Sequence, residues 1–133
     1  MATRHERLNV TTPDAVVNVR QMVRDFALDA RLSLVDQTKL ITAASELARN
    51  MVIYGGGGVV LVEKLVNDTK SGVRVTFTDE GPGIDDITLA LRDGYTTGGG
   101  LGLGLGGAKR LVHEFDVQSA KGRGTTVVIT RWK

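Results

Sequence analysis

The chain contains the stretch Gly94-Tyr95-Thr96-Thr97-Gly98-Gly99-Gly100-Leu101-Gly102-Leu103-Gly104-Leu105-Gly106, in which seven of thirteen residues are glycine. Glycine loses more backbone freedom on folding than any other residue, so this segment is costly to order. A folded protein tolerates that cost where its backbone must approach a ligand closely. Bare backbone N–H groups at the start of a helix can hold the oxygens of a polyphosphate. The stretch therefore predicts a nucleotide-binding domain.

Two familiar glycine motifs do not account for this stretch. A P-loop needs Gly-Lys-Ser/Thr, whereas Lys109 here follows Ala108 and precedes Arg110. Residues 102–107 match G-x-G-x-x-G, but no predicted strand precedes them and no ribose-binding acid follows about twenty residues later. We interpret the stretch as a flap that leads into a helix N-terminus and suits phosphates. A disordered loop tip is the alternative.

Composition limits the classes of function. Hydrophobic residues make up 41% and charged residues 24% of 133 residues, as in a single soluble domain. The absence of cysteine excludes disulfides, a thiol nucleophile and thiolate metal sites. A net charge of +2 and an aromatic content of 5% argue against nucleic-acid binding. No apolar run approaches the ~18 residues of a membrane span, and residues 1–6 lack a signal-peptide core, so we expect a cytoplasmic protein with no membrane contact.

Hydrophobic periodicity predicts an α+β fold, a two-layer α/β sandwich with helices packed on one face of a mixed, mostly antiparallel sheet. Residues 1–133 form one domain. Thr12 is expected to cap the first helix and Ser33 the second, in a capping box with Asp36. The expected strands are 4–10, 59–66, 73–79, 116–120 and 125–132, and the expected helices are 13–30, 34–53, 85–92 and 104–115.

Glu46 and Asn50 are four residues apart on the second predicted helix, so their side chains project from one face. An amide oxygen can bind Mg²⁺, which takes few protein ligands and completes its shell with phosphate oxygens and water. A carboxylate beside it can accept or steer a proton. Taken alone, the pair is more typical of an ordinary exposed helix face that includes Ser45 and Arg49, because charged residues are mostly exposed.

Asp79 ends a predicted strand and leads into Glu80-Gly81-Pro82-Gly83. Its carboxylate can accept a hydrogen bond from an exocyclic amine, and Gly81 and Gly83 would let a flat ring approach the backbone. A plain tight turn with a capping aspartate is the alternative.

Four short motifs together resemble the sequence boxes of the Bergerat-fold, or GHKL, ATPases, which include gyrase-type ATPases and histidine-kinase catalytic domains. The matching stretches are Glu46–Asn50 (asparagine box), Asp79–Ile84 (D-x-G-x-G box), Gly100–Gly104 (second glycine box) and Gly124-Thr125 (late G-T). Each box is weak alone, but the four in order are specific, and the resemblance covers essentially the whole chain. It implies the Bergerat fold, with ATP and Mg²⁺ as cofactors.

The resemblance also implies a role for each matching residue. Glu46 would be the catalytic residue, as general base or by orienting the nucleophile, and Asn50 would coordinate Mg²⁺. Asp79 would accept a hydrogen bond from the adenine amino group, and Thr125 would support adenine through water. The remaining predicted nucleotide-binding residues are Gly81, Gly83, Ile84, Thr97, Gly98, Gly99, Gly100, Leu101, Gly102, Leu103 and Gly104.

The flap departs from many GHKL relatives, because residues 97–100 include no basic side chain. Phosphate charge would then rest on Mg²⁺, backbone amides and Lys109 or Arg110.

Within that superfamily, the small size and the E-x-x-x-N spacing resemble the anti-sigma-factor serine kinases, and residues 93–111 resemble the stressosome switch kinases. This implies ATP-dependent phosphorylation of a serine on a STAS-domain scaffold protein. The released kinase would then activate a metal-dependent protein phosphatase. Three alternatives stay open: a nucleotide-gated binding module, an anti-sigma factor that sequesters a sigma subunit, and a stand-alone ATPase.

Overall fold

Five strands form one sheet in the computed structural model of the chain, which describes residues 1–83 and 104–133. The strand order is β1-β2-β3-β5-β4, and each neighbouring pair is antiparallel. In chain order the elements are β1 (Ala2–Val10), α1 (Asp14–Asp29), α2 (Leu34–Gly55), β2 (Gly58–Asn67), β3 (Lys70–Asp79), α4 (Gly104–Arg110), β4 (Glu114–Ser119) and β5 (Thr125–Trp132).

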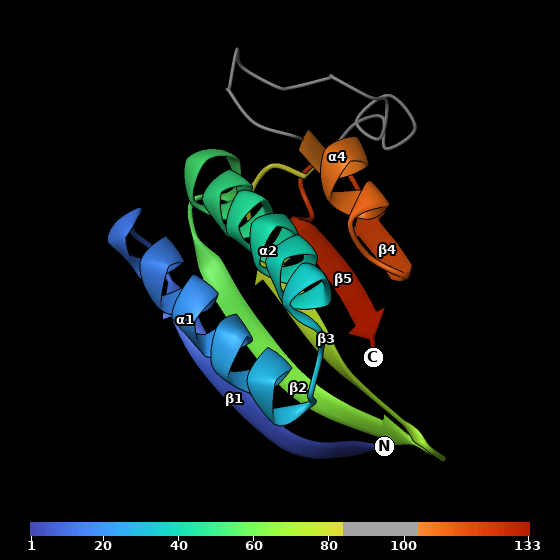
Figure 1. Cartoon of the computed structure of the whole chain (residues 1–133). Helices are drawn as coiled ribbons and strands as arrows, with labels where there is room; N and C mark the ends of the chain where they lie inside the picture. The colour runs from blue at the N-terminus through green and yellow to red at the C-terminus, as the bar shows by residue number, and fades with distance from the viewer. Residues whose placement is uncertain (84–103) are drawn as a thin grey trace.

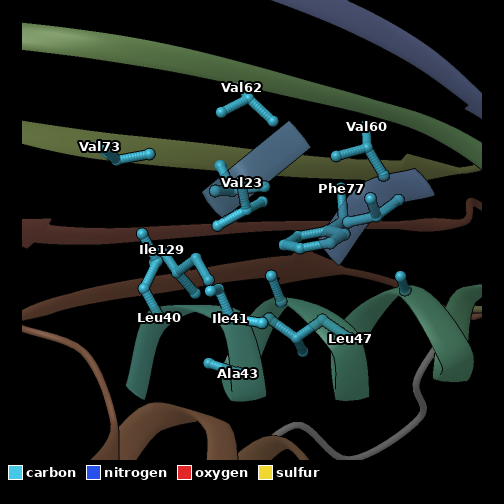
Figure 2. Packing of buried hydrophobic residues seen from close by; sticks show 14 of the residues in the cluster. Val23, Leu40, Ile41, Ala43, Leu47, Val60, Val62, Val73, Phe77 and Ile129 are labelled. Atoms are coloured by element: carbon cyan, nitrogen blue, oxygen red, sulfur yellow. The ribbon is translucent and has the colours of Figure 1, made fainter. Parts of the chain in front are cut away.

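The helices cover one face of the sheet, with α2 lying between α1 and α4 (Figure 1). Leu40 and Leu47 of α2 are buried against the sheet, together with Val60 of β2, Phe77 of β3 and Ile129 of β5 (Figure 2). Burying a side chain of this size contributes about 1.5–3 kcal/mol, so this layer is the main source of stability. The predicted two-layer sandwich is confirmed. None of the helices in the described part of the chain has the length and apolar character of a membrane span.

The structure corrects three details of the expected fold. The sheet is antiparallel and not mixed, because every pair of neighbouring strands in the described residues is antiparallel. No side chain caps α1, so the expected Thr12 cap is wrong; the Thr12 carbonyl instead accepts from the Ala15 N–H at 3.1 Å. The helix expected over 104–115 ends at Arg110, and Glu114 already pairs with Thr130 in the sheet. The short helix expected at 85–92 lies outside the described residues.

The start of α2 is tied to β5 by an ion pair that is largely shielded from water. Ser33 caps α2 as expected and accepts from the Asp36 N–H at 3.1 Å. The Asp36 carboxylate turns instead to Arg131 of β5, whose Nε and Nη2 donate to its Oδ1 at 2.9 and 2.6 Å. Arg131 Nη1 also donates to the Leu111 carbonyl just after α4, at 2.9 Å. One guanidinium therefore joins α2, β5 and the end of α4.

The face of the sheet away from the helices carries the Trp132 side chain. Its ring lies against Gly72 of β3, where an added Cβ would fall 2.7 Å from the ring. The indole N–H donates to Glu114 of β4, and the Trp132 backbone N–H donates to His113 Nδ1 at 2.9 Å. Because the register pairs Val73 with Arg131 on the core face, Trp132 points away from the core.

Candidate nucleotide site

Glu46 and Asn50 lie in the second half of α2, about one helical turn apart. The Glu46 side chain is only 14% exposed, so the expectation of an ordinary exposed helix face is wrong for this residue. Asn50 is half-buried, and its side-chain amide forms no hydrogen bond with the residues that the structure describes. Its amide oxygen is therefore available to a ligand.

Arg49 is the immediate neighbour of this pair. Its Nη1 donates to Glu46 Oε1 at 3.0 Å, and its own side chain is 47% exposed. The more buried carboxylate is thus partly covered by a more exposed guanidinium.

The Asp79 carboxylate is held at the end of β3 by the backbone. The Gly81 N–H donates to its Oδ1 at 2.9 Å, which forms the tight turn that was the alternative interpretation of this stretch. The carboxylate lies directly against the last residue of α2, because an added Cβ on Gly55 would fall 2.6 Å from Asp79 Cγ. Within residues 1–83 and 104–133 no donor reaches Asp79 Oδ2, which is therefore able to accept a hydrogen bond from a bound amine.

Two glycines of the loop after Asp79 are required by contacts within the protein. An added Cβ on Gly81 would fall 2.6 Å from the Gly55 Cα, and one on Gly83 would fall 2.1 Å from the Ala120 carbonyl oxygen. Gly83 also has φ +79°, which favours glycine. These contacts explain why glycine is needed at positions 81 and 83 even without a ligand. The close approach of an adenine ring to Gly81 and Gly83 stays a prediction.

The late Gly124-Thr125 pair lies beside Asp79, as its place in the motif set suggests. Thr125 is the register partner of Asp79 across β3 and β5. Gly124, at φ +76°, lies so close that an added Cβ would fall 2.2 Å from the Asp79 carbonyl oxygen. Asp79 and Thr125, which are 46 positions apart in the sequence, are thereby brought together at one end of strands β3 and β5.

The other predicted nucleotide-binding residues lie mostly outside the described residues. These are Ile84, Thr97, Gly98, Gly99, Gly100, Leu101, Gly102 and Leu103, and their roles stay predictions. Gly104 begins α4, and Lys109 and Arg110 in its last turn are exposed.

The described side chains fit a magnesium ion that is bound mainly through its nucleotide. Among residues 1–83 and 104–133, no three His, Cys, Asp or Glu side chains gather into a metal site. Asn50 offers one uncharged oxygen, which suits Mg²⁺ because this ion keeps several waters and takes phosphate oxygens.

Two residues of this region were missed by the sequence analysis. Ser119 Oγ donates to the Gly124 carbonyl at 2.8 Å and lies 2.9 Å from Thr125 Oγ1, so it fixes the predicted adenine-supporting hydroxyl. Gly55 gives Asp79 its place at the end of α2. The alternation of β4 could have indicated Ser119, because it puts Ser119 on the same face as Phe115 and Val117.

Two solved structures resemble the fold. The RsbU and RsbW domains of Rv1364c from Mycobacterium tuberculosis match 97% of this chain with a TM-score of 0.68 and 24% identity, and this chain spans 32% of that one. The mycobacterial sensor histidine kinase MprB matches 96% of this chain and 97% of its own, with a TM-score of 0.55 and 22% identity. At these identities the likeness shows the fold alone.

Sequence comparison identifies relatives at higher identity. The serine/threonine-protein kinase RsbT of Bacillus subtilis is 40% identical over 125 residues, which cover 94% of both chains. An anti-sigma F factor of Clostridium acetobutylicum is 32% identical over 84% of this chain and 81% of its own. Residues 35–133 match the family described as histidine kinase-, DNA gyrase B-, and HSP90-like ATPase. The predicted resemblance is confirmed: this chain belongs to the histidine kinase-, DNA gyrase B- and HSP90-like (GHKL) ATPase family.

Proposed function

We propose that this protein is a serine/threonine kinase that transfers the γ-phosphoryl group of ATP to a serine of a STAS-domain stressosome scaffold protein. After release, the kinase activates a metal-dependent protein phosphatase in a stress-response pathway of the cytoplasm. The observation that carries the proposal is the 40% identity to the kinase RsbT along 94% of the chain. The half-buried Glu46 beside Asn50, with Asp79 at the end of the same helix, supports it.

The placement of the polar groups suggests how the nucleotide lies. Asp79 would accept from the adenine amino group through Oδ2, while the Gly81 N–H holds Oδ1. Asp79 touches Gly55, and Asn50 and Glu46 precede Gly55 by five and nine residues, or about 7.5 and 13.5 Å along α2. The phosphates would therefore run from Gly55 toward Glu46.

Glu46 and Asn50 would then share the chemistry at the end of the phosphate chain. Bound ATP supplies the phosphoryl group, and Asn50 would hold Mg²⁺, which neutralises phosphate charge. Glu46 would orient the serine hydroxyl and accept its proton as the new Oγ–P bond forms and ADP leaves. Phosphoryl transfer depends mainly on positioning and charge neutralisation, so a site with one base and one metal ligand suits a slow regulatory kinase.

A phosphate-transfer assay with a matched control tests this proposal. Purified protein, Mg-ATP labelled at the γ position and a STAS-domain scaffold are incubated, and label on serine is measured. We expect Glu46→Gln to lower transfer at least about a hundredfold while ATP binding is retained. Glu63→Gln is the control, because the Glu63 side chain is also 14% exposed and paired with an arginine, but lies on β2. Transfer by Glu46→Gln at the wild-type rate would refute the role of Glu46.

A second candidate function is sequestration of a sigma subunit, favoured by the 32% identity to an anti-sigma F factor. The two functions are separated by pull-down with sigma factor in parallel with the transfer assay. Retention of sigma factor without label on a STAS protein would favour the anti-sigma role.

A further inference from the structure

We propose that Arg49 caps the Glu46 carboxylate while no acceptor protein is bound, and so keeps Glu46 from activating water. Arg49 would then be a specificity-determining residue that directs the phosphoryl group of ATP to a protein hydroxyl. The proposal rests on the proposed kinase function and adds to it a reason why ATP is not hydrolysed by water when no acceptor protein is bound.

The ion pair is built so that one member shields the other. Arg49 Nη1 lies 3.0 Å from Glu46 Oε1, and the two exposed fractions are 47% and 14%. The Arg49 side chain is therefore more than three times as exposed, by fraction, as the Glu46 side chain. A carboxylate oxygen that already accepts from a guanidinium is a poorer acceptor for the proton of a water molecule.

The helical positions show that Arg49 and Asn50 occupy different flanks of α2. Asp36, Ala43 and Asn50 are seven residues apart, nearly two turns, so they form one line along the helix. Asp36 bonds to Arg131 of β5, which also holds the end of α4, so this line faces β5 and α4. Arg49 is rotated by about 100° from Asn50 around the helix axis, away from the line that faces β5 and α4.

This arrangement separates the two reactants around Glu46. The nucleotide is expected on the Asn50 flank, between α2 and α4, because Asn50 is the predicted metal ligand. A serine that attacks the phosphorus must then approach from the exposed side, where Arg49 covers the base. The fitting partner is a protein segment that carries an acidic group or exposed carbonyls near its serine, since these can take over the guanidinium.

Both competing reactions balance in the same way. With serine, the Oγ–P bond forms, the bond from phosphorus to the ADP oxygen breaks, and the serine proton passes to Glu46. With water, the same bond breaks, inorganic phosphate forms and the water proton passes to Glu46. Arg49 slows both reactions while it is bonded to Glu46. A docked protein acceptor displaces Arg49 from Glu46, whereas water does not, so only transfer to the protein is released.

The cap itself is tested without nucleotide. Carboxyl labelling by a water-soluble carbodiimide and an amine, followed by mass spectrometry, measures how accessible Glu46 is. We expect Arg49→Gln to raise labelling of Glu46 about fivefold, the factor corresponding to a well-formed surface ion pair. Glu63 is the internal control, because it is 14% exposed and paired with Arg74. Labelling of Glu46 that does not change in Arg49→Gln would overturn the proposal.

The consequence for specificity is tested with ATP in the absence of an acceptor. We expect Arg49→Gln to raise ATP hydrolysis about fivefold, with ATP affinity by calorimetry within twofold of wild type. Lys39→Gln, the same charge change on an exposed residue of α2, should leave hydrolysis unchanged. Weakened ATP binding with no rise in hydrolysis would overturn the proposal, because Arg49 would then contact phosphate. A failure of the proposed function differs, since the wild-type protein would then place no label on a STAS-domain scaffold, whatever Arg49→Gln does to hydrolysis.

Discussion

Replacing Arg131 with methionine should remove the ion pair between α2 and β5 while keeping a side chain of similar length. The substitution deletes two hydrogen bonds to Asp36 Oδ1, at 2.9 and 2.6 Å, and one to the Leu111 carbonyl, at 2.9 Å. Hydrogen bonds to charged groups contribute about 1.5–3 kcal/mol each, and a buried charge left without its partner is strongly destabilising.

The expected loss in the free energy of unfolding depends on how many of the hydrogen bonds made by Arg131 can be replaced by water. The Asp36 side chain is 22% exposed, so water can replace part of the hydrogen bonding that its carboxylate loses. The Arg131 side chain is only 10% exposed in the wild-type protein, so this replacement is incomplete. We therefore expect a loss of about 2–4 kcal/mol in the free energy of unfolding. For a domain of this size that lowers Tm by about 10 °C.

The same pair should make stability depend on pH with a defined sign. The hydrogen bond from Arg131 lowers the pKa of the Asp36 carboxyl below its usual range. A carboxyl whose pKa is lower in the folded state stabilises the protein above the unfolded pKa, about 3.9, and loses that contribution as the pH falls through the folded pKa. The stability difference between wild type and Arg131→Met should therefore be full at pH 7 and shrink below about pH 4.

Urea unfolding at several pH values measures both effects. Arg123→Met serves as the control, because Arg123 is exposed in the turn between β4 and β5 and should change stability by less than about 0.5 kcal/mol. A loss below about 1 kcal/mol at pH 7, or a loss that is the same at acid pH, would refute this account of Asp36 and Arg131.

Two glycine substitutions give further predictions, each with a matched glycine as its control. Gly55→Ala would place a Cβ 2.6 Å from Asp79 Cγ and displace the carboxylate, so calorimetry should show ATP affinity reduced at least about tenfold, the effect of losing one hydrogen bond to a charged group. Gly56→Ala, strained at φ +75° but with no neighbour within 4 Å, should bind ATP normally. Gly124→Ala combines φ +76° with a Cβ 2.2 Å from the Asp79 carbonyl oxygen, and thermal unfolding should show a loss above about 3 kcal/mol. Gly122→Ala, at φ +78° in open space, should lose only about 1–2 kcal/mol, and equal losses at both positions would contradict the role of the contact.

Patterns within one element predicted most of the fold. The apolar stripes of α1 and α2 and the Ser33 cap depend on neighbours three or four residues away, and the structure has both helices within about two residues of the expected bounds. The hairpin of β2 and β3 was equally readable, because strand alternation and a turn are local signals.

Features that depend on distant partners were not predictable in the same way. Asp36 and Arg131 are 95 residues apart, and nothing near Asp36 indicates that its carboxylate leaves the capping box. The helix from Gly104 ends early because Glu114 and the residues after it pair with β5, which a helical pattern does not reveal. In the candidate site, the motifs indicated Asp79 and Thr125, but the close contact of Gly55 appears only once α2 meets the end of β3.

The packing of Trp132 on Gly72 has a practical consequence. Trp132 is the only tryptophan in the chain, and it lies seven residues along β5 from Thr125, or about 23 Å. Its indole is held by Glu114 on the face of the sheet opposite the helices. Its fluorescence emission will therefore follow separation of β3, β4 and β5 during denaturation, while a ligand seated beside Asp79 leaves that optical signal unaltered.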